Sequence, residues 1–322
     1  MREEIKRLIK EELSQIETWL QRLCISQHPF INQVSEYILF SGGKRIRPLL
    51  CVLSAKALGE DSKDQLYQTS LLFEYLHVAT LLHDDVVDSA EFRRGRKAAR
   101  NLWGNQATIL VGDYLYAKAL KIASSLKNPN IMEAITETTF LMSEGEILQL
   151  LHLDDTYLSE ASYNEIIYRK TAALISCSCK VGAILSGGSS SQVDSLGNYG
   201  LNLGMAFQII DDLLDYLGSE TGKDRGKDFR EGKITLPVIL ALDSASETDR
   251  ERLITLLKKR DSSQEDFQIA FSIIEKNGGF QRSLQKAKDF TMQAKEFLKE
   301  IPDSLYKDSL FFIADFILER KK

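Results

Sequence analysis

Apolar residues recur at three- and four-residue steps along nearly the whole chain of 322 residues, and this constrains the fold more than any other feature. In residues 66–87, for example, Leu72, Tyr75, Ala79 and Leu82 are spaced for one face of a helix. No alternating polar and apolar stretch bounded by hairpin turns interrupts the pattern. The pattern predicts helices over residues 2–23, 29–41, 45–58, 66–87, 105–126, 129–152, 160–184, 192–216, 234–243, 247–259, 263–276, 278–299 and 303–319.

The chain shows no segment that would divide it into separate domains. Breakers such as Ser41-Gly42-Gly43 and Asn277-Gly278-Gly279 fall between the periodic segments, but no linker or low-complexity stretch is long enough to separate two folds. Five prolines suit long helices, and an apolar content of 43% supplies a core. We therefore expect one large all-α domain over residues 1–322, a helical bundle.

Composition excludes several classes of protein. A net charge of −5 argues against a nucleic-acid binder, which would need a basic face. The first eight residues, Met1 to Leu8, are charged where a signal peptide would be apolar, and every uninterrupted apolar run is shorter than the roughly 20 residues of a membrane span. Four scattered cysteines give no disulfide framework and indicate a reducing compartment. These features predict a cytoplasmic protein without a membrane span.

Two acidic clusters of the form DDxxD stand out inside apolar, helix-like runs: residues 84–88 and residues 211–215. On a helix, the first and last Asp of each cluster lie on one face. Clustered carboxylates repel one another, and hard divalent cations relieve that repulsion, usually with a phosphate or diphosphate as a further ligand. A solvated acidic patch is the alternative, but two copies among Leu, Ile and Val favour metal sites.

Three basic elements accompany these clusters. Residues 42–48 (GGKRIRP) place three cations at the start of a helix, where an anionic ligand would offset their conflict with the helix dipole. Residues 93–96 (RRGR) follow the first cluster closely, and Arg offers a fork that matches phosphate oxygens. Residues 218–233, rich in Gly, Lys and Arg, follow the second cluster and suggest a lid over phosphates. Solvated turns and loops are the alternative for each.

His77 lies seven residues before Asp84, two helical turns back on roughly the same face. A lone histidine in an apolar helix is more often structural than functional. No Ser/His/Asp pattern and no activated cysteine indicates covalent catalysis, so electrostatic stabilisation of a departing phosphate fits the residues better.

In this combination the chain resembles the trans-type isoprenyl (polyprenyl) diphosphate synthases, and the resemblance covers residues 36–237. The resemblance implies the helical bundle of isoprenoid synthases around a central cavity. Each motif alone is weak, but the ordered set is specific. The motifs are Gly42–Pro48, Asp84–Asp88, Arg93-Arg94-Gly95, Lys170-Thr171, Asp211–Asp215, and the loop from Gly222-Lys223 to Glu231-Gly232-Lys233.

The resemblance assigns residues to two substrates. The allylic diphosphate would be held through about three Mg²⁺ ions, chiefly by Asp84, Asp88 and Asp211, with Asp85, Asp212 and Asp215 in support. Isopentenyl diphosphate would bind without metal. The resemblance implies the isopentenyl-binding set Lys44, Arg47, His77 and Arg94, and the allylic-binding set Arg93, Lys170, Gln208, Lys223 and Lys233, with Gln149 as a further polar position and Thr171 beside the reacting carbon.

The same resemblance implies a mechanism and an assembly. Loss of diphosphate would leave an allylic cation, which the isopentenyl double bond attacks before a proton is lost. The family forms homodimers, and its long products seek membranes. One departure concerns the lid: the family often has Gly-Asp-Asp where this chain has Gly226-Lys227-Asp228, so a cation replaces an acid there.

Product length depends on residues just before the first cluster. Ala79 and Thr80 lie five and four residues before Asp84, about 6–7.5 Å along a helix axis. Short-chain members place bulky aromatic residues here, whereas both residues are small in this chain. We therefore expect the apolar tunnel to continue to a floor near Phe140, and a product in the C30–C50 class.

Other functions remain open on the sequence. The first alternative is a synthase of shorter, C20 products. A class I terpene cyclase would share the acidic pocket but would not need Lys44, Arg47 and Arg94. A silent subunit of a heteromeric synthase is expected to have lost one acidic cluster, and this chain keeps both.

Overall fold

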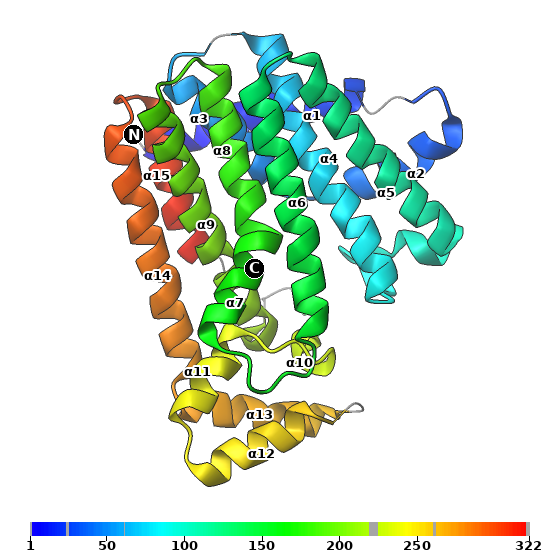
Figure 1. Ribbon diagram of the computed structural model, residues 1–322, viewed down its shortest axis with the longest axis vertical. Helices are drawn as coiled ribbons and strands as arrows, with labels where there is room; N and C mark the ends of the chain where they lie inside the picture. Colours follow the sequence, from blue (N-terminus) through cyan, green and yellow to red (C-terminus); the bar gives the residue numbers. More distant parts are fainter. Residues whose placement is uncertain (1, 24–25, 61, 219–224, 260–261, 320–322) are drawn as a thin grey trace. The chain divides into compact units, whose positions relative to one another are not determined.

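The computed structural model is helical throughout apart from one short hairpin (Figure 1). It describes residues 2–23, 26–60, 62–218, 225–259 and 262–319. The α-helices are α1 (Arg2–Leu23), α2 (Pro29–Leu39), α3 (Ile46–Ala57), α4 (Lys63–Val87), α5 (Ala99–Ser125), α6 (Pro129–Leu151), α7 (Glu160–Ile167), α8 (Ala173–Leu185), α9 (Ser190–Leu217), α10 (Lys227–Arg230), α11 (Leu236–Ser244), α12 (Glu247–Leu257), α13 (Gln264–Lys276), α14 (Gly279–Phe297) and α15 (Leu305–Leu318). None of these helices is long and apolar enough to cross a membrane.

The all-α prediction is confirmed, and most predicted helices agree with the observed bounds within a few residues. Two differences matter for the site. The helix predicted over residues 160–184 is interrupted by a π-helical turn, Tyr168–Ala172. A hairpin of β1 (Phe92–Arg93) and β2 (Arg96–Lys97), which the apolar pattern did not predict, follows α4.

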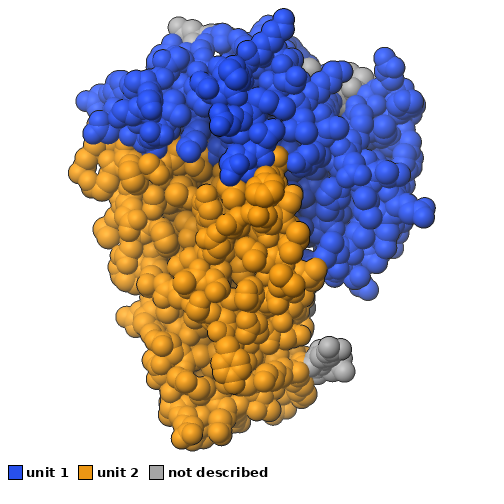
Figure 2. Space-filling view, viewed as in Figure 1, with its two compact units in different colours: residues 1–137, 177–196, 300–310 blue, residues 138–176, 197–299, 311–322 orange. Residues whose placement is uncertain are grey.

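The chain divides into two compact units, coloured separately in Figure 2. Unit 1 contains residues 1–137, 177–196 and 300–310, and unit 2 contains residues 138–176, 197–299 and 311–322. Because each unit is assembled from three chain segments, neither corresponds to one stretch of sequence. The single domain over residues 1–322 stays a prediction.

Unit 1 is built around α4, which packs against α1, α3 and α5. The side chains of Leu72, Phe73, Tyr75 and Ala79 on α4 are fully buried, as the apolar spacing of this segment requires. The close approach of α8 to α3 depends on Gly182, where a Cβ would lie 2.3 Å from the carbonyl oxygen of Cys51. Helix α3, which α8 approaches in this way, in turn packs against α4, the helix that carries the first acidic cluster.

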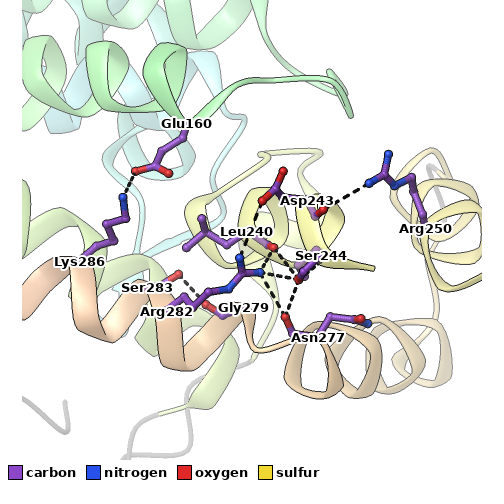
Figure 3. A network of polar contacts seen from close by, with 11 residues as sticks. Glu160, Leu240, Asp243, Ser244, Arg250, Asn277, Gly279, Arg282, Ser283 and Lys286 are labelled. Carbon is purple, nitrogen blue, oxygen red and sulfur yellow. Dashed lines mark hydrogen bonds and ion pairs between the residues drawn. The ribbon is translucent and has the colours of Figure 1, made fainter. Parts of the chain in front are cut away.

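Unit 2 holds α11 against α13 and α14 through a network of polar contacts centred on Arg282 (Figure 3). The Arg282 guanidinium donates to the carbonyls of Leu240 and Asn277 and, at 2.6 Å, to the Ser244 hydroxyl. These acceptors lie at the C-terminal ends of α11 and α13, where helix carbonyls lack partners within the helix. Arg282 therefore anchors α11, whose N-terminal end follows the predicted lid.

The helix contact at Gly182 gives a stability prediction. Gly182→Ala should lower the free energy of unfolding by about 2 kcal/mol or more, because α8 and α3 must separate to admit the methyl group. Urea unfolding measures this change. Lys180→Ala, on the same helix but partly exposed, should cost much less; equal losses for the two variants would contradict this account of the packing.

Candidate active site

The first acidic cluster lies at the C-terminal end of α4, in unit 1. Asp84 and Asp85 belong to the last helical turn, and Asp88 caps the helix by donating its N–H to the Asp84 carbonyl at 2.8 Å. Asp85 is buried, whereas Asp84 and Asp88 are partly exposed. Carboxylates at a helix C-terminus oppose the helix dipole, so this position favours a bound cation.

The hairpin that follows α4 brings Arg93 to the buried carboxylate. The Nε and Nη2 atoms of Arg93 each lie 2.7 Å from Oδ1 of Asp85. Between β1 and β2, Arg94 and Gly95 both have positive φ angles, 51° and 75°, as a type I′ turn requires. The hairpin thus places the guanidinium group of Arg93 against the acidic cluster, whereas that of Arg94 lies away from it.

Arg94 contacts the glycine-rich loop instead. Its guanidinium donates to the carbonyl of Gly42 and reaches the Ser41 hydroxyl at 3.5 Å. At Gly43, whose φ is 145°, a Cβ would lie 2.9 Å from a nitrogen of Arg45 and 3.2 Å from one of Arg94. The loop therefore needs glycine here, because two guanidinium groups pack against its backbone. Lys44 is exposed beside them.

His77 lies in a strongly positive environment. Burial lowers the pKa of His77 well below its usual value, and the charges of nearby arginines lower it further, chiefly those of Arg47 and Arg94 and then Arg93 and Arg45. The imidazole is therefore neutral at neutral pH. A concentration of positive charge around an uncharged polar ring suits an anionic ligand.

The second acidic cluster lies on α9, in unit 2, and its aspartates differ in their surroundings. Asp211 is exposed, and Asp212 is buried. Oδ2 of Asp212 accepts a hydrogen bond from the Tyr163 hydroxyl at 2.5 Å, and Oδ1 accepts one from Gln208 at 2.8 Å. Burial raises the pKa of Asp212 to about 7; both hydrogen bonds oppose this rise, and the charge of Asp211 adds to it.

Asp215, the last residue of this cluster, holds the segment after it. Its carboxylate accepts the backbone N–H groups of Lys227, at 3.2 Å, and Asp228, at 3.1 Å. Its carbonyl accepts the N–H of Gly226 at 2.9 Å. Burial raises the pKa of Asp215, and these backbone hydrogen bonds oppose the shift. Asp215 thus fixes the start of α10 to the second acidic cluster.

The two described lysines of the predicted lid both lie near Glu231. Lys227, which replaces an acid of the family pattern, lies 3.3 Å from Glu231, and Lys233 lies 2.9 Å from the same carboxyl group. Glu231 therefore balances the additional charge of Lys227 within the lid. Lys223 lies outside the described residues, and its assignment stays a prediction.

The π-helical turn Tyr168–Ala172 carries Lys170 and Thr171. Lys170 pairs with Glu146 of α6 at 2.6 Å, and the Thr171 hydroxyl donates to Gln208 at 2.7 Å. Through Gln208, Thr171 is linked to Asp212 in one hydrogen-bonded chain. The π-helix is rare and appears most often at functional positions.

Two glycines let neighbouring helices reach this turn. A Cβ on Gly145 of α6 would lie 2.7 Å from the backbone nitrogen of Lys170, and one on Gly204 of α9 would lie 2.5 Å from Cα of Ala172. Larger residues would displace the turn. The close packing on both sides explains how an irregular turn is held in place.

The residues predicted to control product length differ in exposure. Ala79 is fully buried on α4, and the Thr80 hydroxyl is partly buried and donates to the His77 carbonyl at 2.8 Å. Phe140, predicted to lie near a tunnel floor, is 59% exposed on α6. The role of Phe140 stays a prediction.

The carboxylate positions fit magnesium that is shared with a substrate. Among the described residues, no three His, Cys, Asp or Glu side chains form a metal site by themselves. Mg²⁺ is typically bound by one or two carboxylates together with phosphate oxygens and water. The accessible carboxylates of Asp84, Asp88 and Asp211 suit that form of binding.

Several predicted residues are brought together within each unit. In unit 1, Arg93 meets Asp85, and His77 lies among arginines that include Arg47 and Arg94. In unit 2, Thr171, Gln208 and Asp212 form one chain. Sequence reasoning missed Tyr163, the second donor to Asp212. A tyrosine in a segment without a motif gave no signal that could have identified it.

Comparison with known proteins supports the resemblance found in the motifs. The sequence model of the Polyprenyl synthetase family matches residues 28–274. An octaprenyl diphosphate synthase from Haemophilus influenzae is 34% identical over 320 residues, 99% of this chain and 97% of that protein. The crystal structure of a decaprenyl diphosphate synthase from Rhodobacter capsulatus is 36% identical, with a TM-score of 0.93 and full coverage of both chains.

Similarity extends to an enzyme of another product class. A short chain isoprenyl diphosphate synthase from Methanothermobacter thermautotrophicus is 39% identical over 295 residues, 90% of each chain. Long-chain and short-chain enzymes therefore resemble this chain to a similar degree, so identity alone does not distinguish product length.

The environment of His77 gives a pH prediction. Its pKa in the folded protein is lower than in the unfolded chain, so the stability it contributes is complete above the unfolded pKa of about 6.5 and is lost progressively as the pH falls from there towards the lower folded pKa. When the pH is lowered from about 7.5 to about 5.5, the unfolding free energy of His77→Gln should therefore fall by about 1 kcal/mol less than that of the wild type.

Urea unfolding at the two pH values measures this difference. His28→Gln, at an exposed histidine, should behave as the wild type does. A His77→Gln protein with the same acid sensitivity as the wild type would contradict the lowered pKa of His77 that burial and the arginines are expected to produce.

Proposed function

Since the chain belongs to the polyprenyl synthetase family and is a prenyltransferase, we propose that it joins isopentenyl diphosphate to an allylic diphosphate and makes a long-chain all-trans polyprenyl diphosphate. Farnesyl or geranylgeranyl diphosphate would be the primer.

One observation supports the proposal most strongly: each acidic cluster combines a buried aspartate with a more exposed one. Each has one buried carboxylate held by fixed donors, Asp85 by Arg93 and Asp212 by Tyr163 and Gln208. Each also has a more exposed first aspartate, Asp84 or Asp211. A merely solvated acidic patch would not need a buried carboxylate with fixed donors in both units. A pair of ion-binding clusters would need it, because a fixed carboxylate keeps the neighbouring aspartates in position to bind ions.

In the proposed reaction, Asp84, Asp88 and Asp211 would hold about three Mg²⁺ ions, which would supply positive charge to the departing allylic diphosphate. Asp85, Asp212 and Asp215 support these ligands. Direct cationic contacts come from Arg93, Lys170, Lys223 and Lys233, and Lys170 would exchange Glu146 for the diphosphate. These cations stabilise the charge that develops as the carbon–oxygen bond breaks.

The second substrate reacts with the allylic cation. Lys44, Arg47, His77 and Arg94 hold isopentenyl diphosphate without metal. Its double bond supplies the electron pair for the new carbon–carbon bond, and a proton then passes to the released diphosphate, so that an allylic diphosphate one C5 unit longer is formed. Thr171 donates its proton to Gln208, which leaves its oxygen lone pairs available to the cation.

The proposed product is in the C30–C50 class because Ala79 and Thr80 are small. Aromatic side chains at these positions would close an apolar path along α4, and none is present. A C20 geranylgeranyl diphosphate synthase is the second candidate, favoured by the similarity to a short-chain enzyme. We further propose a homodimer, a cytoplasmic location and a membrane-seeking product.

The function is tested by incubating the purified protein with isopentenyl diphosphate, farnesyl diphosphate and Mg²⁺, and sizing the products by chromatography. We expect polyprenyl diphosphates longer than C20. The absence of elongation would contradict the synthase activity, and a product that stops at C20 would contradict the long-chain assignment alone.

Ala79→Phe should shorten the product because an aromatic ring at this buried position would block the growing tail. We expect the main product to fall by at least about two C5 units, since the ring occupies roughly the space one helical turn before Asp84. The same chromatographic assay measures it. Ala79→Ser, which keeps the small volume, should leave the length unchanged, and an unshortened Ala79→Phe product would contradict the tunnel.

A further inference from the structure

Arg45 differs from the cations beside it. Its side chain is buried, with 4% of its surface exposed, although Lys44 before it is exposed. Nε donates to Glu17 of α1 at 2.7 Å, Nη1 donates to Glu74 of α4 at 2.6 Å, and Nη2 donates to the carbonyl of Leu39 at 2.5 Å. Each guanidinium nitrogen thus has an acceptor within unit 1, and the buried side chain is committed to these contacts.

The same residue sets the backbone of the glycine-rich loop. Arg45 is the N-cap of α3 and has a left-handed conformation, with φ 48° and ψ 34°. Residues other than glycine adopt this region only when the surroundings impose it. Here the three fixed acceptors of the side chain impose it. The orientation of Lys44, the residue before this strained position, follows from those contacts.

Glu74, one of the two carboxylates that hold Arg45, also acts on Arg94. Burial lowers the pKa of Arg94, and among charged neighbours Glu74 opposes this shift most strongly, while Arg45 adds to it. Both guanidinium groups pack against Gly43. The negative charge of Glu74 attracts Arg94, which the charge of Arg45 would otherwise repel. Glu74 thereby allows the positively charged side chains of Arg45 and Arg94 to pack against the same short loop.

We propose that Arg45, Glu17 and Glu74 form a positioning unit for the metal-free subsite of isopentenyl diphosphate. The unit sets the direction of Lys44 and holds Arg94 at the loop without touching the substrate. Through Glu17, helix α1 becomes part of the support of this subsite, although it carries none of the motifs. This inference rests on the proposed function, because it takes the occupant of the loop to be isopentenyl diphosphate.

Isothermal titration calorimetry with isopentenyl diphosphate in EDTA tests the inference, because chelation removes metal-dependent binding of diphosphates. Glu17→Gln keeps the shape of the side chain and removes its charge, and Arg45→Lys keeps the charge and removes the fork. We expect Kd to rise about three- to tenfold in each variant, since a displaced loop weakens its contacts to the diphosphate. Glu11→Gln, on the exposed face of α1, is the matched control and should bind as the wild type does.

Kinetics separate positioning from a general structural role. We expect the KM for isopentenyl diphosphate to rise in parallel with Kd, while the KM for farnesyl diphosphate and the melting temperature stay close to wild type. Equal rises in both KM values, or a lower melting temperature with unchanged affinity, would overturn the inference. So would a wild-type protein that does not bind isopentenyl diphosphate in EDTA. A wild type that binds it but elongates nothing would instead contradict the proposed function.

Discussion

Electrostatic repulsion among carboxylates is the constraint on which the proposed site depends. Asp84, Asp85 and Asp88 crowd the end of α4, where the helix dipole is already negative, and Asp212 is buried on α9 beside Asp211 and Asp215. Burial is the main cause that raises the pKa values of Asp212 and Asp215, and the charges of Asp211 and Asp215 raise that of Asp212 further. Arg93, Tyr163, Gln208 and the backbone of α10 offset part of the cost of this arrangement. We attribute the remainder to positive charge supplied by metal ions when a diphosphate binds.

Around His77 the imbalance is the opposite, because the arginines outnumber the acidic side chains that pair with them. Arg45 pairs with Glu17 and Glu74, and Arg93 pairs with Asp85, while Lys44, Arg47 and Arg94 add three further cations at the loop. An anion bound there needs no metal ion. The two kinds of environment, acidic clusters that need cations and a basic loop that needs an anion, correspond to the two diphosphates of the proposed reaction.

Sequence periodicity was sufficient for the all-α fold and for most helix bounds, because amphipathic spacing is a local property. It did not predict the π-helical turn at Lys170, since that turn depends on close packing against Gly145 and Gly204, which are distant in sequence. Motif spacing identified the acidic and basic clusters, but it did not predict which of the aspartates are buried and which are exposed. The inward orientation of Arg45 and the contact of Tyr163 with Asp212 arise from tertiary packing, which the sequence does not display.

The central claim of the proposed function is that the aspartates of both acidic clusters bind diphosphate through metal ions. Thermal unfolding with Mg²⁺ and inorganic diphosphate, added singly and together, tests it most directly. The account predicts that the melting temperature of the wild type rises strongly only when both are present, because ligand bound to the folded state adds stability. The rise should be largely lost in Asp84→Asn and in Asp211→Asn, and kept in Asp194→Asn, at an exposed acid on α9. An equal rise in all four proteins would contradict it.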